Sequence, residues 1–167
     1  MADEREVLTW DGFGVAAREL GRRIADDGYR PDVILAIARG GLPIGSALAY
    51  SLAVKSCFAL NVEYYTGVEQ RLDAPVVLPP LLNMDEAAGA RVLITDDVAD
   101  TGHTLETVRD LCADRVADAR IAVVYEKPGS QVACDYVWRR TDQWIDFPWS
   151  SEPPFVAKET PAWVAEA

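Results

Sequence analysis

Short apolar runs that alternate with helix-like segments constrain the fold of this chain more than any other feature. VILAIA at 33–38 is continuously apolar, as expected of a strand buried on both faces of a sheet. Further strands are predicted at 58–65, 92–95, 121–126 and 135–138, and helices over 11–27 with Asp11 as N-cap, from Pro43 to about Ser51 and from Thr104 to about Ala113. The alternation predicts an α/β fold, a mostly parallel twisted sheet flanked by helices.

Two segments depart from this alternation. Residues 66–89 contain three prolines and no clean periodicity, so we expect a mobile loop there. Past Asp146 the chain becomes rich in Pro and Trp and loses its regular pattern. We therefore predict a single domain over 1–167, with a core at about 10–127 and a small C-terminal hood at about 128–155.

The charge balance limits the class of partner. Asp and Glu number 27 against 16 Lys and Arg, a formal net charge of -11, which disfavours nucleic acid and anionic membrane as partners. Three cysteines without a CxxC pair and a single histidine argue against a disulfide framework or a zinc site. The start of the chain lacks the features of a signal peptide, and no apolar run is long enough to span a membrane. These observations predict a soluble protein of the cytoplasm.

The segment VLITDDVADTGHT at 92–104 carries the strongest chemical signal. An apolar strand precedes two adjacent carboxylates, Asp96 and Asp97, which could accept hydrogen bonds from the hydroxyls of a sugar. Asp100, Thr101 and Gly102 then lead into a helix N-terminus, which suits a phosphate. The order predicts a sugar phosphate site. The plain alternative is an acidic turn that caps a helix, with Asp100 or Thr101 as N-cap.

This segment resembles the phosphoribosyl diphosphate signature of the type I phosphoribosyltransferases. ARGG at 38–41, directly after the first buried strand, resembles the loop that binds pyrophosphate in that family. The alternative for this loop is a tight turn with a solvent-facing arginine. The resemblance implies that phosphoribosyl diphosphate is bound by Arg39, Gly40, Asp96, Asp97, Asp100, Thr101, Gly102, His103 and Thr104.

EKPG at 126–129, DYVW at 135–138 and WIDFPW at 144–149 most resemble the bacterial xanthine–guanine branch, which acts on 6-oxopurines. The resemblance assigns Lys127 to the oxygen at purine position 6, Trp144 to stacking on the ring and Ile145 to the base edge through its backbone. Alternatively, Lys127 is a solvated lysine and Trp144 is a core residue. For Trp149 we expect a place in the core.

The resemblance implies transfer of ribose 5-phosphate to a purine nitrogen with release of pyrophosphate, with Mg²⁺ as cofactor and Asp97 as its ligand. Asp100 would be the general acid/base, and Gln70 and Arg71 would belong to a lid formed by 66–89. A homodimer or homotetramer is expected.

Three other functions are compatible with parts of this sequence. One is a non-catalytic sensor on this fold that binds phosphoribosyl diphosphate or a nucleotide. Another is an enzyme for adenine or a pyrimidine, against which Lys127 and Trp144 argue. The third is a phospho-receiver domain, for which the acids lie on the wrong elements. The sequence does not rank guanine, xanthine and hypoxanthine.

Overall fold

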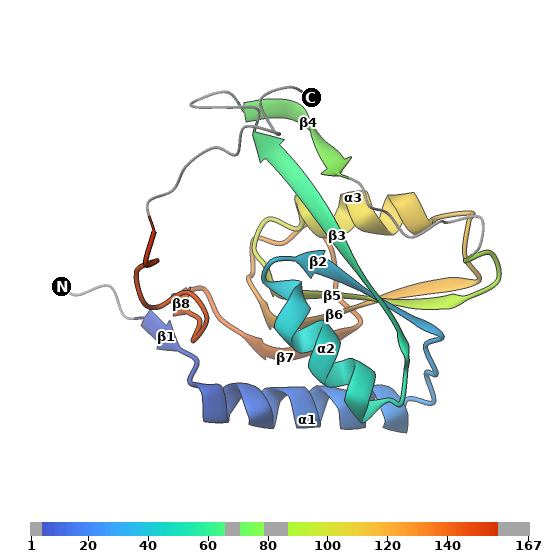
Figure 1. Ribbon diagram of the computed structural model, residues 1–167, viewed down its shortest axis with the longest axis horizontal. Helices are drawn as coiled ribbons and strands as arrows, with labels where there is room; N and C mark the ends of the chain where they lie inside the picture. The colour runs from blue at the N-terminus through green and yellow to red at the C-terminus, as the bar shows by residue number, and fades with distance from the viewer. Residues whose placement is uncertain (1–4, 66–70, 79–86, 157–167) are drawn as a thin grey trace.

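The computed structural model describes residues 5–65, 71–78 and 87–156. Within them a six-stranded sheet has the order β4-β3-β2-β5-β6-β7 (Figure 1). Its members, in chain order, are β2 (Val33–Ala38), β3 (Ser56–Tyr65), β4 (Arg71–Leu78), β5 (Arg91–Ala99), β6 (Asp118–Glu126) and β7 (Tyr136–Arg140). All neighbours pair in parallel except β3 and β4, which are antiparallel. The predicted α/β fold with a mostly parallel sheet is confirmed.

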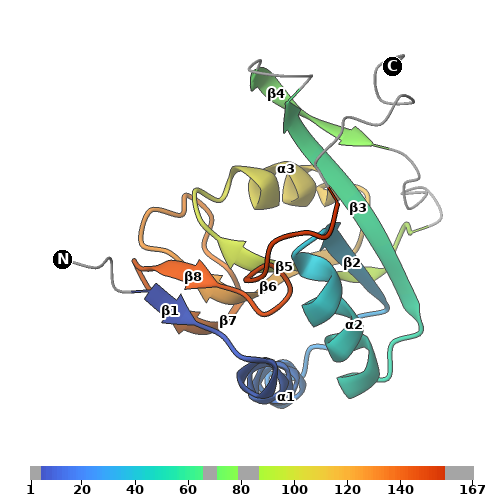
Figure 2. The same cartoon turned by 60° about the vertical axis from the view of Figure 1, so that its left-hand side comes forward.

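Helices cover both faces of this sheet. The helices α1 (Trp10–Asp26) and α2 (Gly41–Ser51) lie on one face, and α3 (His103–Cys112) lies on the other (Figures 1 and 2). Alternate residues of β2 therefore enter different cores. Ile34 packs in the core beneath α1 and α2, whereas Leu35 packs in the core beneath α3. A strand buried on both faces reads as a continuous apolar run, and this explains VILAIA.

β4 occupies part of the stretch that was expected to be irregular. The expectation is wrong for 71–78, because these residues pair with the end of β3 at the edge of the sheet. This strand was not predicted because it contains Pro75. Proline has no N–H group to donate to a neighbouring strand and is tolerated mainly in edge strands. Of the two expected lid residues, Arg71 begins β4 and Gln70 lies outside the described residues.

A second, two-stranded sheet joins the two ends of the described chain. It pairs β1 (Arg5–Val7) with β8 (Trp144–Asp146) in parallel, close to β7 in Figure 2. Arg5 forms a 2.8 Å ion pair with Asp146, and the buried Tyr125 hydroxyl donates to Glu6 at 3.0 Å. Neither strand was predicted, because three residues show no periodicity.

The helix starts differ slightly from expectation. Thr9, not Asp11, is the N-cap of α1, because its hydroxyl accepts a hydrogen bond from the Gly12 amide at 3.0 Å. Asp11 lies in the first turn, where its negative charge interacts favourably with the positive end of the helix dipole. In the described part of the chain, no helix has the length and apolar character needed to cross a membrane.

Candidate active site

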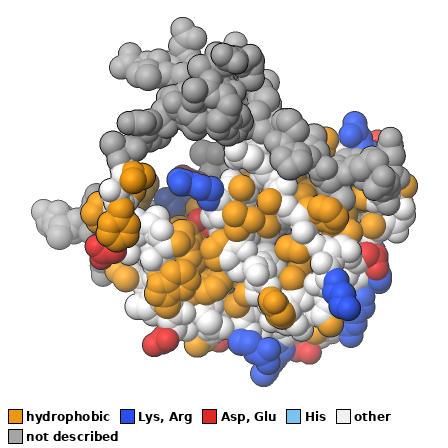
Figure 3. All heavy atoms as spheres, in the orientation of Figure 1, with side chains coloured by type: hydrophobic (Ala, Val, Ile, Leu, Met, Phe, Trp, Pro, Cys, Tyr) orange, Lys and Arg blue, Asp and Glu red, His pale blue; other side chains and the backbone are white. Residues whose placement is uncertain are grey.

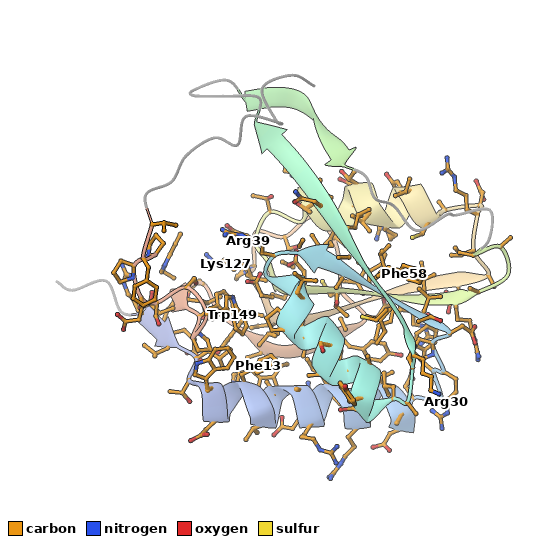
Figure 4. The ribbon with its side chains drawn as sticks, viewed as in Figure 1. Phe13, Arg30, Arg39, Phe58, Lys127 and Trp149 are labelled. Carbon is orange, nitrogen blue, oxygen red and sulfur yellow. The ribbon has the colours of Figure 1, made fainter. Side chains whose placement is uncertain are left out.

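The predicted site residues gather where three neighbouring parallel strands end. Arg39 follows β2, Asp96 and Asp97 lie near the end of β5, and Lys127 follows β6. Figure 4 shows Arg39 and Lys127 at the same end of the sheet, and Figure 3 shows basic side chains in a hollow there. In open parallel sheets, ligands bind beyond the carboxyl ends of the strands.

β5 continues past the predicted end at Thr95, so both adjacent acids are strand residues. Its pairing with β6 extends to Ala99 opposite Glu126. An Asp96 carboxylate oxygen accepts a hydrogen bond from the Asp97 amide at 2.9 Å, and both side chains are half-buried. Burial and the neighbouring Asp97 charge raise the pKa of Asp96 well above its usual range, and burial also raises the pKa of Asp97. Two such carboxylates are stabilised by hydroxyl donors or a cation.

The loop after β2 lies directly against these acids. A Cβ atom on Gly40 would overlap the Asp97 carboxylate, and one on Gly41 would overlap the Thr95 carbonyl oxygen. The Ala38–Arg39 peptide bond is cis, and the Arg39 side chain is exposed. Both positions therefore require glycine, because the backbone lies close to β5. This agrees with the interpretation of Gly40 and Gly41 as a tight turn. The exposed Arg39 side chain can still contact a ligand.

The loop between β5 and α3 ends at Gly102, which is the N-cap of α3. Gly102 has φ of 85° and no side-chain cap, so the interpretation of Asp100 or Thr101 as N-cap is wrong. The Gln131 amide donates to the Thr101 carbonyl at 2.9 Å, and this bond holds the loop against 130–132. His103 and Thr104 form the first turn of α3. A helix N-terminus without a side-chain cap offers N–H groups to an anion.

A cavity of about 230 Å³ lies beside this loop, and the three predicted purine-binding residues line it. It is lined by Val98, Asp100, Lys127, Trp144, Ile145, Asp146, Phe147 and Ser150. The Lys127 ammonium is 3.6 Å from an Asp100 carboxylate oxygen and 5.5 Å from the centroid of the Trp144 ring. The Trp144 side chain is 62% exposed, so it is not a core residue. Lys127 is only 18% exposed and is paired, so it is not a solvated lysine.

Trp149 combines a core position with a place near the site. It is half-buried and packs against the aromatic residues of the core beneath α1, as expected. Its indole N–H opposes the rise in the pKa of the Asp97 carboxyl. Sequence reasoning missed this proximity because 149 and 97 lie on separate elements with no shared motif. It also missed Val98, Asp146, Phe147 and Ser150 in the cavity, although WIDFPW carries two of them.

The donor set at the strand ends suits Mg²⁺ shared with a substrate. Among the described residues no group of three or more His, Cys, Asp or Glu side chains could hold a metal ion. Mg²⁺ often binds through only one or two carboxylates together with waters and substrate phosphates. The half-buried Asp96 and Asp97 pair provides such carboxylates, and a cation would offset their mutual repulsion.

Known proteins are similar to this chain over most of its length. The family described as phosphoribosyl transferase domain matches residues 4–155. A xanthine-guanine phosphoribosyltransferase of Idiomarina loihiensis is 32% identical over 145 residues, which cover 85% of this chain and 84% of that protein. The enzyme of the same name from Nitratidesulfovibrio vulgaris is 33% identical over 151 residues, covering 89% of this chain and 86% of that protein.

A solved structure agrees with these relatives. The crystal structure of a purine phosphoribosyltransferase from Pyrococcus horikoshii superposes with a TM-score of 0.77 at 33% identity, covering 92% of this chain and 99% of that chain. The match of the family over most of the chain, the relatives above 30% identity and the shared fold agree, and the resemblance inferred from the motifs is confirmed. The chain belongs to the phosphoribosyltransferase family.

Proposed function

We propose that this protein is a purine salvage enzyme that transfers ribose 5-phosphate from phosphoribosyl diphosphate to a 6-oxopurine and releases pyrophosphate. The base would be guanine, xanthine or hypoxanthine. One observation carries the proposal: Asp100, Lys127 and Trp144 line a single cavity, which is also lined by Val98, the residue that follows Asp96 and Asp97 in β5. A base in this cavity would lie beside a sugar held at the end of β5.

The cavity has groups for each part of an oxopurine. Trp144 offers an exposed aromatic face on which the ring can stack. The Lys127 ammonium can only donate hydrogen bonds, so it favours an oxo group over an amino group at position 6. Ile145 is buried in β8 and would contact the edge of the base through its backbone.

The donor would bind across the three strand ends. Arg39 and the Gly40 backbone would hold the pyrophosphate, because guanidinium and exposed amides both donate to phosphate oxygens. The loop 100–104 and the N-terminus of α3 would hold the 5-phosphate. Asp96 and Asp97 would accept hydrogen bonds from the ribose hydroxyls. Arg39 and the N-terminus of α3 would supply the local positive potential that a chain of net charge -11 otherwise lacks.

Asp100 would serve the proton transfer. As the bond from the anomeric carbon to the pyrophosphate oxygen breaks, a purine ring nitrogen forms a new bond to that carbon and loses its proton. The exposed Asp100 carboxylate can take this proton. The Lys127 ammonium, 3.6 Å away, would hold the carboxylate in position. Mg²⁺ held by Asp97, with Asp96 beside it, would neutralise charge that develops on the pyrophosphate.

An assay of the purified protein tests this function. The protein is incubated with phosphoribosyl diphosphate, Mg²⁺ and each of guanine, xanthine, hypoxanthine and adenine in turn. Nucleotide formation with at least one oxopurine and none with adenine is expected. Turnover of adenine alone would contradict the base assignment. Tight donor or nucleotide binding without any turnover would replace the enzyme with a sensor.

We also propose a homodimer or homotetramer in the cytoplasm. A groove of about 480 Å³ between α2 and β3 is lined by Ser46, Ala49, Tyr50, Ala53, Val54, Lys55 and Cys57, of which only Lys55 is charged. Tyr50 is 89% exposed there, and Figure 3 shows hydrophobic side chains gathered over the face on which α2 lies in Figure 1. Two copies of an acidic chain associate most readily through a face that has no acidic side chain. The three free cysteines are consistent with a reducing compartment.

A further inference from the structure

The purine cavity contains one charged side chain that the proposed reaction does not use. Asp146 lines this cavity together with Lys127 and Trp144. Trp144 and Asp146 are two residues apart in β8, so their side chains lie on the same side of the strand, whereas the buried Ile145 lies on the other. A base stacked on Trp144 would therefore have the Asp146 carboxylate close to one of its edges.

Strand β1 holds Asp146 in place. An Arg5 guanidinium nitrogen donates to one carboxylate oxygen of Asp146 at 2.8 Å, and the Leu8 amide donates to the Asp146 carbonyl at 3.0 Å. Figure 2 shows β1 and β8 side by side. Among the described residues Arg5 is the only partner of this carboxylate, and the Asp146 side chain is 30% exposed. The second carboxylate oxygen can therefore accept a hydrogen bond from a ligand.

A lysine and a carboxylate in one cavity distinguish purines by their substituents. The Lys127 ammonium only donates hydrogen bonds and suits an oxo group at position 6, whereas an ionised carboxylate only accepts them. At position 2, guanine carries an amino group, which donates. Xanthine carries an oxo group there, which would face a carboxylate unfavourably, and hypoxanthine carries only hydrogen.

We propose that Asp146 determines which 6-oxopurine is preferred, by accepting a hydrogen bond from the amino group at position 2 of guanine. Arg5 is a positioning residue that keeps the carboxylate in the orientation for this contact. Guanine is then the preferred base and xanthine the poorest of the three. The inference rests on the proposed function, for which it names the preferred substrate.

Asp146→Asn tests the contact with the base. The amide has nearly the shape of the carboxylate, but it is uncharged and can donate to an oxo group. Loss of a hydrogen bond to a charged group should lower the ratio of kcat/KM for guanine to that for hypoxanthine about tenfold, and the ratio for guanine to xanthine at least as much. Hypoxanthine is the matched control substrate, because it has no donor at position 2. Equal losses for all three bases, unchanged ratios, or a preference for xanthine in the unsubstituted protein would overturn the inference.

Arg5→Ala tests the positioning role. It should lower the guanine to hypoxanthine ratio in the same direction, and it should cause no further loss when combined with Asp146→Asn. Arg139→Ala is the matched control, because Arg139 pairs with Glu6 of the same strand at 3.3 Å and not with Asp146. It should leave the ratio unchanged. An unchanged ratio in Arg5→Ala, or an equal fall in Arg139→Ala, would overturn the role of Arg5.

Nucleotide binding separates this inference from the proposed function. Calorimetry should show that guanosine monophosphate binds more tightly than inosine monophosphate, and Asp146→Asn should remove the difference. That result in a protein that turns over no base would refute the proposed enzyme and support the contact with position 2. Turnover of oxopurines without such a difference would overturn the inference and leave the proposed function intact. A protein with neither turnover nor nucleotide binding would refute both.

Discussion

At the scale of single residues, the site depends on side chains that are far apart in sequence. Asp100 and Lys127 follow neighbouring strands, and the parallel pairing of β5 with β6 brings their charges to 3.6 Å. Trp144 comes from the hood and covers the same cavity. Each of these side chains has a separable role, so substitutions should alter different kinetic constants.

Replacement of Asp100 by Asn should remove the proton acceptor and preserve the shape of the loop. We expect turnover to fall about 10²- to 10⁴-fold. The dissociation constant of the donor should change less than about twofold, because the α3 N-terminus and Arg39 are untouched. Steady-state kinetics and calorimetry measure the two effects, and turnover near that of the unsubstituted enzyme would exclude Asp100 as the base.

Trp144→Ala should act on the purine instead. Stacking of a base on an aromatic ring contributes about 1–3 kcal/mol, so the KM for the purine should rise about tenfold or more. The KM for phosphoribosyl diphosphate should stay the same, and Trp144→Phe should recover most of the loss. A rise in the donor KM of equal size would mean that the ring serves the fold of the hood rather than the base.

At the scale of elements, β2 and β5 are joined at their amino ends by a cluster that lies opposite the site. The Asp32 carboxylate accepts hydrogen bonds from the Arg91 backbone amide at 2.9 Å and from two guanidinium nitrogens at 3.0 Å. These bonds from Arg91 lower the pKa of Asp32 from 3.8 to about 2. Polar contacts thus join β2 and β5 at their amino ends, whereas the candidate site lies at their carboxyl ends.

The lowered pKa of Asp32 sets the sign of a stability prediction. The folded protein favours the charged form of Asp32. The ion pair with Arg91 therefore stabilises the folded state fully above pH 3.8, and this stabilisation is lost as the pH falls through about 2. Asp32→Asn should lower the free energy of unfolding by about 0.5–1 kcal/mol at pH 7, since the pair is exposed.

Urea unfolding at several pH values measures this difference. It should shrink steadily between pH 4 and pH 2, and Asp110→Asn, at an exposed position of α3, should show no such trend. A difference that stays constant with pH would mean that the charge of Asp32 contributes nothing to stability.

At the scale of the whole molecule, the net negative charge opposes association of two copies, whereas the groove between α2 and β3 has no acidic side chain and favours it. A charge of -11 keeps copies apart over most of the surface, whereas the groove between α2 and β3 offers a face without that repulsion. Tyr50 projects from this groove and would be its main apolar contact.

Tyr50→Glu should therefore dissociate the proposed oligomer. The substitution removes the main apolar side chain of the groove and adds a carboxylate that must be desolvated in the contact, so light scattering after gel filtration should give the mass of one chain. Val15→Glu is the control, because Val15 is an exposed apolar residue of α1 outside the groove. Dissociation by Val15→Glu alone would place the interface on α1.

The sequence by itself determined the order of the main elements and the chemistry at their ends. Apolar runs of the right length identified β2, β5 and β6, because strands buried on both faces must be continuously apolar. Asp96 and Asp97 were recognised because ligands bind where parallel strands end, whereas Lys127 was assigned from the resemblance to the 6-oxopurine enzymes.

Only the tertiary structure decided how far each element extends and which distant residues meet. β5 runs through its acids because β6 continues to pair with it, and β4 forms because β3 offers a free edge. The β1–β8 pair joins segments without a common periodicity. Local patterns record the burial of a segment but not the identity of its distant neighbours, because many sequences can satisfy the same contact.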